Sequence, residues 1–76
     1  MLRASLTNGL MAHLGASVTI AEERVLLGLQ RGLSNRAIAA ELILSRRTVE
    51  SHISHLLAKT GCKNRTQLLL WVMSER

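Results

Sequence analysis

The segment from residue 34 to residue 61 places the tightest constraint on the fold, because it contains two helical patterns separated by a short break. Ser34 and Ser45 each stand at the start of one pattern. Serine is a preferred N-cap because its hydroxyl accepts a hydrogen bond from a free N–H group in the first turn of a helix. The first of these two helices must be short, since Ser45 already begins the next.

The helix expected after Ser45 has a single narrow apolar face. Small and polar residues occupy most of its other positions, and Gly61 supplies the left-handed residue that ends it. Such a helix buries one face and presents short hydrogen-bonding side chains flanked by cations on the rest, as contact with the DNA major groove requires. The alternative is an ordinary solvated amphipathic helix. The apolar positions follow helical spacing at Val49, Ile53, Leu56, Leu57 and Thr60.

An earlier helix is expected from Ile20 to Arg31. Thr19 and Glu22 have the spacing of a capping box, and Gly32 is placed to end the helix in the left-handed conformation. The short helix after Ser34 and the helix that begins after Ser45 then form a helix-turn-helix arrangement, in which one tight turn separates two short helices. The short helix is expected to point four apolar side chains inward, namely those of Ile38, Ala39, Leu42 and Ile43.

The final helix is expected to begin after Asn64, which has Gln67 three residues later in the pattern of a capped helix start. From Leu68 to Met73 every residue is apolar, so the helix is apolar around its whole circumference. One side can face the domain core, and the other side predicts an interface, because exposed apolar surface of this kind marks association. The alternative, a fully buried helix, is hard to accommodate in so small a domain.

Residues 1–17 are expected to form an N-terminal helical arm, and residues 18–76 the folded domain. Leu2, Leu6, Leu10 and Leu14 recur at i+4 spacing, although Gly9 weakens the helix. The apolar side of the arm needs a cover, which could be the domain itself, a second subunit or a larger domain. A transit peptide is a poor alternative, because the arm contains a single arginine.

The chain has 76 residues, which is enough for one small domain. Trp71 is the only aromatic residue, so Leu, Ile, Val, Ala and Met must build the core, and these favour an all-α fold. A net charge of +5 indicates a polyanionic partner, either nucleic acid or an anionic membrane surface. Five of the ten cations fall between residues 45 and 65 against one acid, Glu50: Arg46, Arg47, Lys59, Lys63 and Arg65.

Several functional classes do not fit the sequence. Cys62 is the only cysteine, which excludes an internal disulfide, argues against a structural zinc site and favours a reducing cytoplasm. No apolar run approaches the roughly 20 residues that cross a bilayer. No nucleophile–base pair, carboxylate dyad or glycine-rich phosphate loop is present, so we expect no enzyme activity, cofactor, metal or small-molecule substrate.

A dense set of residues between Val18 and Met73 follows the pattern of one known family, without an insertion. The chain resembles the LuxR/FixJ-type (GerE-like) helix-turn-helix domain of bacterial transcription regulators. The resemblance implies a four-helix bundle with scaffold helices at Ile20–Arg31 and Asn35–Ile43, a recognition helix at Arg46–Thr60 and a dimerisation helix at Arg65–Met73. The matching residues are Val18, Thr19, Glu22, Val25, Leu26, Gly32, Leu33, Ser34, Asn35, Ile38, Ala39, Leu42, Ser45, Thr48, Val49, His52, Lys59, Gly61, Arg65, Thr66 and Gln67.

The resemblance also implies which residues contact DNA. Bases would be contacted by Glu50, Ser51 and Ser54, and at about 100° per residue Arg47 lies on the same stripe. The positions implied for phosphates, together with cations and helix N-termini that suit phosphate, are Ser34, Asn35, Arg36, Arg46, Thr48, His52, Lys59 and Lys63.

The expected partners are double-stranded DNA, a second copy of the chain and, for a transcription regulator, RNA polymerase. A dimer would bind an inverted repeat whose half-sites lie about one helical turn apart. The expected dimer interface consists of Arg65, Leu69, Leu70, Val72 and Met73.

Four residues need separate interpretation. Glu50 stands where the family usually has lysine, so an anion that can only accept hydrogen bonds replaces a cation, and both affinity and specificity should differ. His52 and His55 could join Cys62 in a metal cluster, but we interpret both as residues flanking the phosphate side. Cys62, where the family commonly has valine, is interpreted as a small apolar filler. The alternative is a thiol that forms an intersubunit disulfide under oxidation.

A competing hypothesis is a protein-interaction module that uses the last helix and the N-terminal arm and has lost DNA affinity through Glu50. The surviving cations around the recognition helix favour DNA. A membrane-surface role fits least, because the cations do not lie opposite a broad apolar face on one long helix. Members of the family usually have a receiver or ligand-sensing domain ahead of this one, so the chain is expected to be either a stand-alone regulator or a truncated one.

Overall fold

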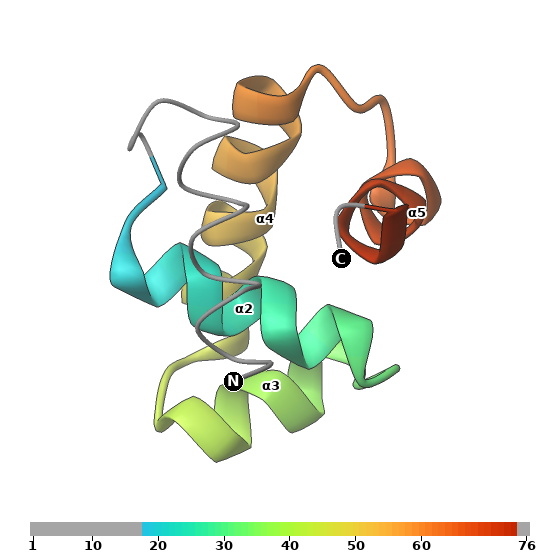
Figure 1. Cartoon of the computed structure of the whole chain (residues 1–76). Helices are drawn as coiled ribbons and strands as arrows, with labels where there is room; N and C mark the ends of the chain where they lie inside the picture. The colour runs from blue at the N-terminus through green and yellow to red at the C-terminus, as the bar shows by residue number, and fades with distance from the viewer. Residues whose placement is uncertain (1–17, 75–76) are drawn as a thin grey trace.

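The computed structural model describes residues 18–74, which form four α-helices and, within that range, no strand (Figure 1). The helices are α2 (Ile20–Gln30), α3 (Asn35–Leu42), α4 (Arg46–Thr60) and α5 (Arg65–Ser74). The expected all-α, four-helix arrangement is therefore confirmed, with helix ends displaced by one residue at most. The expected N-terminal arm lies outside the described residues.

Local capping explains where the helices begin. The Thr19 hydroxyl accepts a hydrogen bond from the N–H of Glu22 at 3.1 Å, and the Glu22 carboxylate accepts one from the N–H of Thr19 at 3.1 Å. This is the reciprocal capping box that the sequence predicts for α2. The side chains of Ser34, Ser45 and Asn64 accept N–H bonds at the starts of α3, α4 and α5 in the same way.

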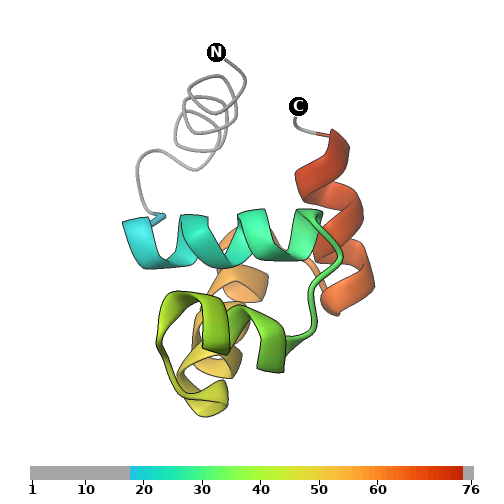
Figure 2. The same cartoon turned by 90° about the horizontal axis from the view of Figure 1, so that it is seen from below.

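The core lies where α2 and α4 pack together, and each of these two helices also contacts α3 and α5. Figures 1 and 2 show α2 crossing α4, with α3 near the start of α4 and α5 near the end of α2. Aliphatic side chains from all four helices fill this space, as the absence of other aromatics beside Trp71 requires. The fully buried members include Val25, Leu26, Ile38, Val49, Leu56, Leu68 and Val72.

Gly28 allows α2 and α3 to approach closely. A Cβ atom at this position would lie 2.8 Å from Cγ1 of Ile38, which is inside van der Waals contact. The sequence alone does not indicate this role, because a single glycine inside a helical pattern does not reveal which helix will pack against it.

The turn between α3 and α4 contradicts one expectation. Ile43 was expected to point into the core, but it is 90% exposed and its backbone is left-handed, with φ 58° and ψ 50°. The N–H of Leu44 donates to the carbonyl of Ala39 at 2.8 Å, so the chain has already left the helix at this point. Helical spacing therefore stops applying one residue earlier than the sequence analysis assumed.

The last helix has one buried side and one exposed side, as expected. Leu68 and Val72 are fully buried, whereas Leu70 is 63% exposed and Met73 is 44% exposed. Arg65, at the start of α5, donates one hydrogen bond to the carbonyl of Leu33 at 2.7 Å and another to the side-chain oxygen of Asn35. These bonds hold the beginning of α5 against the beginning of α3.

Candidate nucleic-acid interface

The outward face of α4 displays all four side chains expected to contact bases. Val49, Ile53 and Leu56 are buried and fix the rotation of the helix about its axis. This rotation leaves the base-contacting candidates exposed along one face: Arg47, Glu50, Ser51 and Ser54. The face offers one cation, one anion and two hydroxyls, and therefore both donors and acceptors for base edges.

The first turn of α4 combines cations with a helix N-terminus. Arg46 and Arg47 are exposed there, next to the positive end of the helix dipole. Ser45 accepts a hydrogen bond from the N–H of Thr48 at 3.1 Å, and the two hydroxyls lie 2.9 Å apart. The hydroxyls of Ser45 and Thr48 thus bond locally, while the two guanidinium groups face solvent, where they can meet phosphate.

A second polar group lies where α3 and α5 begin. Ser34 uses its hydroxyl to cap α3, and the side-chain oxygen of Asn35 accepts from Arg65. Arg36 and Lys63 are exposed at these helix starts. Both cations can meet an anion, whereas the Asn35 oxygen already has a partner within the chain.

Lys59 is positioned differently from the other phosphate candidates. Its side chain is only 27% exposed, and its ammonium lies 2.5 Å from Oε1 of Glu22, whose side chain is 4% exposed. Burial raises the pKa of the Glu22 carboxyl. Hydrogen bonds from Lys59 and the Thr19 N–H, with the charge of the Lys59 ammonium and a smaller electrostatic contribution from His52, outweigh burial and hold the pKa of Glu22 below its ordinary value. Lys59 therefore stabilises a buried carboxylate in this fold.

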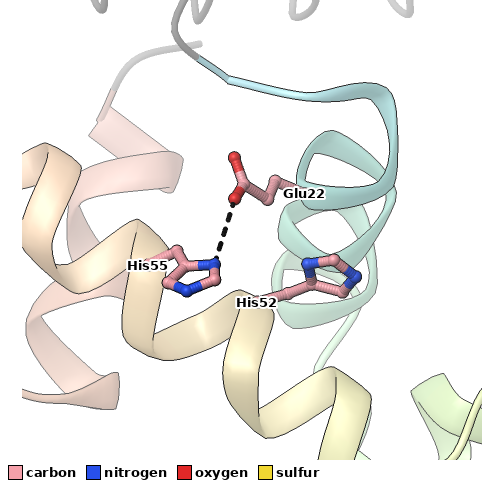
Figure 3. Close-up of side chains that lie close together, drawn as sticks. All are labelled: Glu22, His52 and His55. Atoms are coloured by element: carbon pink, nitrogen blue, oxygen red, sulfur yellow. Dashed lines mark ion pairs between the residues drawn. The ribbon is translucent and has the colours of Figure 1, made fainter.

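Glu22 also brings the two α4 histidines into one cluster (Figure 3). Nδ1 of His55 lies 3.7 Å from Oε2 of Glu22, and His52 lies beside them, half-buried. The sequence analysis considered Cys62 as the third member and missed Glu22, because Glu22 was assigned only to capping. The available signal was the position of Glu22 on the apolar face of an expected helix, with Val25 and Leu26 three and four residues later. A carboxylate buried on such a face needs a cationic partner.

The residues expected at the dimer interface are placed unequally. Leu70 and Met73 are exposed and Leu69 is half-buried, but Val72 is fully buried within the core of its own chain. Because its side chain has no surface to offer, we remove Val72 from the expected interface. Arg65 is exposed, with its guanidinium bonded to α3 of the same chain.

Cys62 is half-buried and packs against the hydrophobic core. This position is what the interpretation as a small apolar filler requires. Its oxidation chemistry stays a hypothesis.

Comparison with known proteins gives a consistent family. The family described as "Bacterial regulatory proteins, luxR family" matches residues 16–72. The chain is 43% identical over 56 residues to the uncharacterized transcriptional regulatory protein YhcZ of Bacillus subtilis, covering 74% of this chain and 26% of YhcZ. It is 49% identical over 47 residues to the DNA-binding transcriptional activator DevR/DosR of Mycobacterium tuberculosis, covering 60% of this chain and 22% of that activator.

A third relative is the nitrate/nitrite response regulator protein NarL of Escherichia coli, 36% identical over 59 residues, which are 78% of this chain and 27% of NarL. The chain thus spans about a quarter of the length of these relatives. No solved structure matches significantly. None of the helices in residues 18–74 has the length and apolar character to cross a lipid bilayer. With a family match over most of its length and the expected four-helix bundle, the chain belongs to the LuxR family of bacterial regulatory proteins.

Proposed function

We propose that this domain binds double-stranded DNA sequence-specifically and regulates transcription, with α4 lying in the major groove. One observation supports the proposal above the others: α4 is anchored by a narrow buried stripe and leaves Arg47, Glu50, Ser51 and Ser54 exposed on one face. A helix placed in this way can insert into a groove without exposing the core. The name of the DevR/DosR relative, a DNA-binding transcriptional activator, points in the same direction.

The proposed contacts divide into two classes. Arg47, Ser51, Ser54 and Glu50 contact base edges, with Glu50 accepting from a cytosine amino group. Phosphates are contacted by Arg46, by the exposed cations Arg36 and Lys63, and by polar groups at helix starts. Lys59 and His52 lie at the margin of this surface, where Lys59 has its main partner in Glu22.

We further propose that two copies associate through the exposed side of α5. Leu70 and Met73 are large apolar side chains left uncovered by the rest of residues 18–74, and Leu69 lies beside them, half-buried. Pairing these helices about a two-fold axis would cover the apolar side chains and repeat the α4 surface symmetrically. The target is then an inverted repeat with half-sites about one helical turn apart.

The DNA proposal is tested by selecting bound duplexes from a random pool and measuring affinity for the selected site at several salt concentrations. Arg46→Ala should weaken binding to every sequence and reduce the slope of log affinity against log salt by about one. Arg24→Ala removes the same charge from the exposed side of α2 and serves as the matched control. Equal slopes for the two variants would contradict the assignment of Arg46 to phosphate.

The dimer proposal is tested by sedimentation analysis. Leu70→Glu places a charge on the exposed side of α5 and should shift the chain to monomer and weaken binding to the inverted repeat. Ile20→Glu, at another exposed apolar residue, is the control. An unchanged association state in Leu70→Glu would reject this interface. If no duplex is selected while α5 still mediates association, the competing protein-interaction function is favoured instead.

A further inference from the structure

The first turn of α2 and the middle of α4 meet at a cluster of three side chains that can all donate to a metal ion. Glu22, His52 and His55 each offer one ligand atom, and these atoms all lie within 4.8 Å of one another. Figure 3 shows both imidazole rings on the side of α4 that faces the carboxylate of Glu22. We propose that these three residues bind one divalent transition-metal ion, with Zn²⁺ as the best match to their chemistry.

The two oxygens of Glu22 have separate surroundings. Oε1 accepts hydrogen bonds from the N–H of Thr19 at 3.1 Å and from the ammonium of Lys59 at 2.5 Å. Oε2 faces His55 instead, at 3.7 Å from its Nδ1 atom. A cation on Oε2 therefore leaves the capping box and the ion pair with Lys59 intact.

The histidines provide the second line of argument. Nδ1 of His52 is buried and has no hydrogen-bond partner among residues 18–74. A buried nitrogen without a partner is costly, and a metal ion bound to Nδ1 itself would satisfy this atom. His55 is three residues along the same helix face, and its side chain is 65% exposed, so its ring is free to rotate toward a metal.

The ligand set suits zinc. Two imidazole nitrogens and one carboxylate oxygen recur in zinc sites that keep a fourth position for water. Zinc–ligand distances of about 2.0–2.2 Å place tetrahedral ligands roughly 3.4 Å apart, so ligand atoms that lie within 4.8 Å of one another must approach by at most about 1.4 Å. The ammonium of Lys59 nearby opposes a second cation, so the affinity should be lower than that of thiolate-rich zinc sites.

A metal ion here would link two helices that the sequence places far apart. Glu22 belongs to α2, whereas His52 and His55 belong to α4, so the bound ion would fix the proposed recognition helix to the scaffold. Metal affinity can be measured without DNA, and the proposal therefore stands or falls independently of the proposed function.

The test is a titration of the whole chain, freed of metal by a chelator, with ZnCl₂ followed by calorimetry and with CoCl₂ followed by visible absorption. We expect one ion per chain and a rise in the melting temperature with Zn²⁺. His55→Asn removes an exposed ligand without affecting the core. It should weaken binding by at least about tenfold, since even partners outside the ligand shell contribute that much to metal sites.

Two matched variants separate this site from other metal ligands. Cys62→Ser removes the only thiol, and His13→Gln removes the remaining histidine outside the cluster. Both should bind Zn²⁺ as the wild type does. The proposal is overturned if His55→Asn binds Zn²⁺ with unchanged affinity, if either control loses binding, or if the wild type shows no saturable binding of Zn²⁺ or Co²⁺.

Discussion

The two faces of α4 differ in what they contribute to the molecule. The inner face, with Val49, Ile53 and Leu56, is buried against the other helices. The outer face, with polar side chains such as Ser51 and Ser54, is exposed. One helix thus keeps stability and proposed DNA recognition on separate residues, so that either can change without the other.

The separation is incomplete at the edge shared with α2. Lys59, His52 and His55 lie between the two faces and surround the buried carboxylate of Glu22. A substitution at this edge should alter both stability and any ligand contact. The expected change in the free energy of unfolding therefore decreases from the inner face, through this edge and the turn before α4, to the outer face.

The largest effect is expected on the inner face. Leu56→Ala removes a fully buried side chain that packs at the centre of the core. Loss of apolar burial and the resulting cavity should lower the free energy of unfolding by about 2–5 kcal/mol. Chemical denaturation followed by circular dichroism measures this change. Ile20→Ala truncates an aliphatic side chain at an exposed position outside the proposed dimer interface and should cost well under half as much; equal losses would show that the two positions are not distinguished by burial.

The next effect is expected at the shared edge. Lys59→Met keeps an unbranched side chain that is one atom shorter, but it leaves the Glu22 carboxylate buried without its ammonium partner. An unpaired buried charge should lower the free energy of unfolding by about 1–3 kcal/mol at neutral pH. Lys63→Met, at an exposed lysine, is the control and should change stability by less than about 0.5 kcal/mol.

The pH dependence of the free energy of unfolding of Lys59→Met tests the same Glu22–Lys59 ion pair. The measurement is made with a chelator present, so that no metal ion binds Glu22. In the wild type the pKa of Glu22 is lowered, so its contribution is present at neutral pH and is lost as the pH falls through that lowered pKa. Without Lys59, burial should raise the pKa instead, and protonation would then favour the folded variant. The stability deficit should therefore shrink in acid, and a constant deficit would contradict the ion-pair explanation.

A smaller effect of opposite sign is expected in the turn before α4. Ile43 adopts a left-handed backbone that costs a β-branched residue about 1–2 kcal/mol, and its exposed side chain gains little from burial. Ile43→Gly should raise the free energy of unfolding by about 0.5–1 kcal/mol. The opposite kind of change can be made after α2, where Gly32 also has a left-handed backbone, with φ +81°. A Cβ atom there would meet no atom within 4 Å, so Gly32→Ala tests the backbone strain alone and should lower the free energy of unfolding by a similar amount. A lower free energy of unfolding in Ile43→Gly would contradict the proposed backbone strain at Ile43.

The smallest stability effect is expected on the outer face. Ser54→Ala removes an exposed hydroxyl and should change the free energy of unfolding by less than about 0.5 kcal/mol. Its effect should appear in DNA binding instead, as a change in the preferred base at one position of the selected site. An unchanged preference would remove Ser54 from the base-contacting set.

Helix starts and ends were largely predictable because their signals are local. Thr19, Ser34, Ser45 and Asn64 cap the four helices through neighbours three residues away, and Gly61 ends α4, all as the sequence indicates. The prediction that Ile43 points into the core was wrong because left-handed caps usually have glycine, and an isoleucine at this position fits the apolar pattern of the helix.

Long-range pairings were not predictable in the same way. Glu22 and Lys59 are 37 residues apart, and Gly28 meets Ile38 only once two helices pack. The spacing of apolar residues within one helix shows which side of that helix is buried. It does not show which side chains of another helix this buried side contacts. The resemblance to a known family suggested contact positions for DNA, and the structure adds which of them are exposed and which, like Lys59, already have a partner.

The most direct test of the central claim is a ¹H–¹⁵N correlation titration of the labelled chain with the duplex selected from a random pool. We predict that the largest shifts fall on the outer face of α4, at Arg47, Glu50, Ser51 and Ser54, and at the starts of α3 and α4. Shifts confined to α5, or no shifts with any duplex at low salt, would contradict DNA binding through α4.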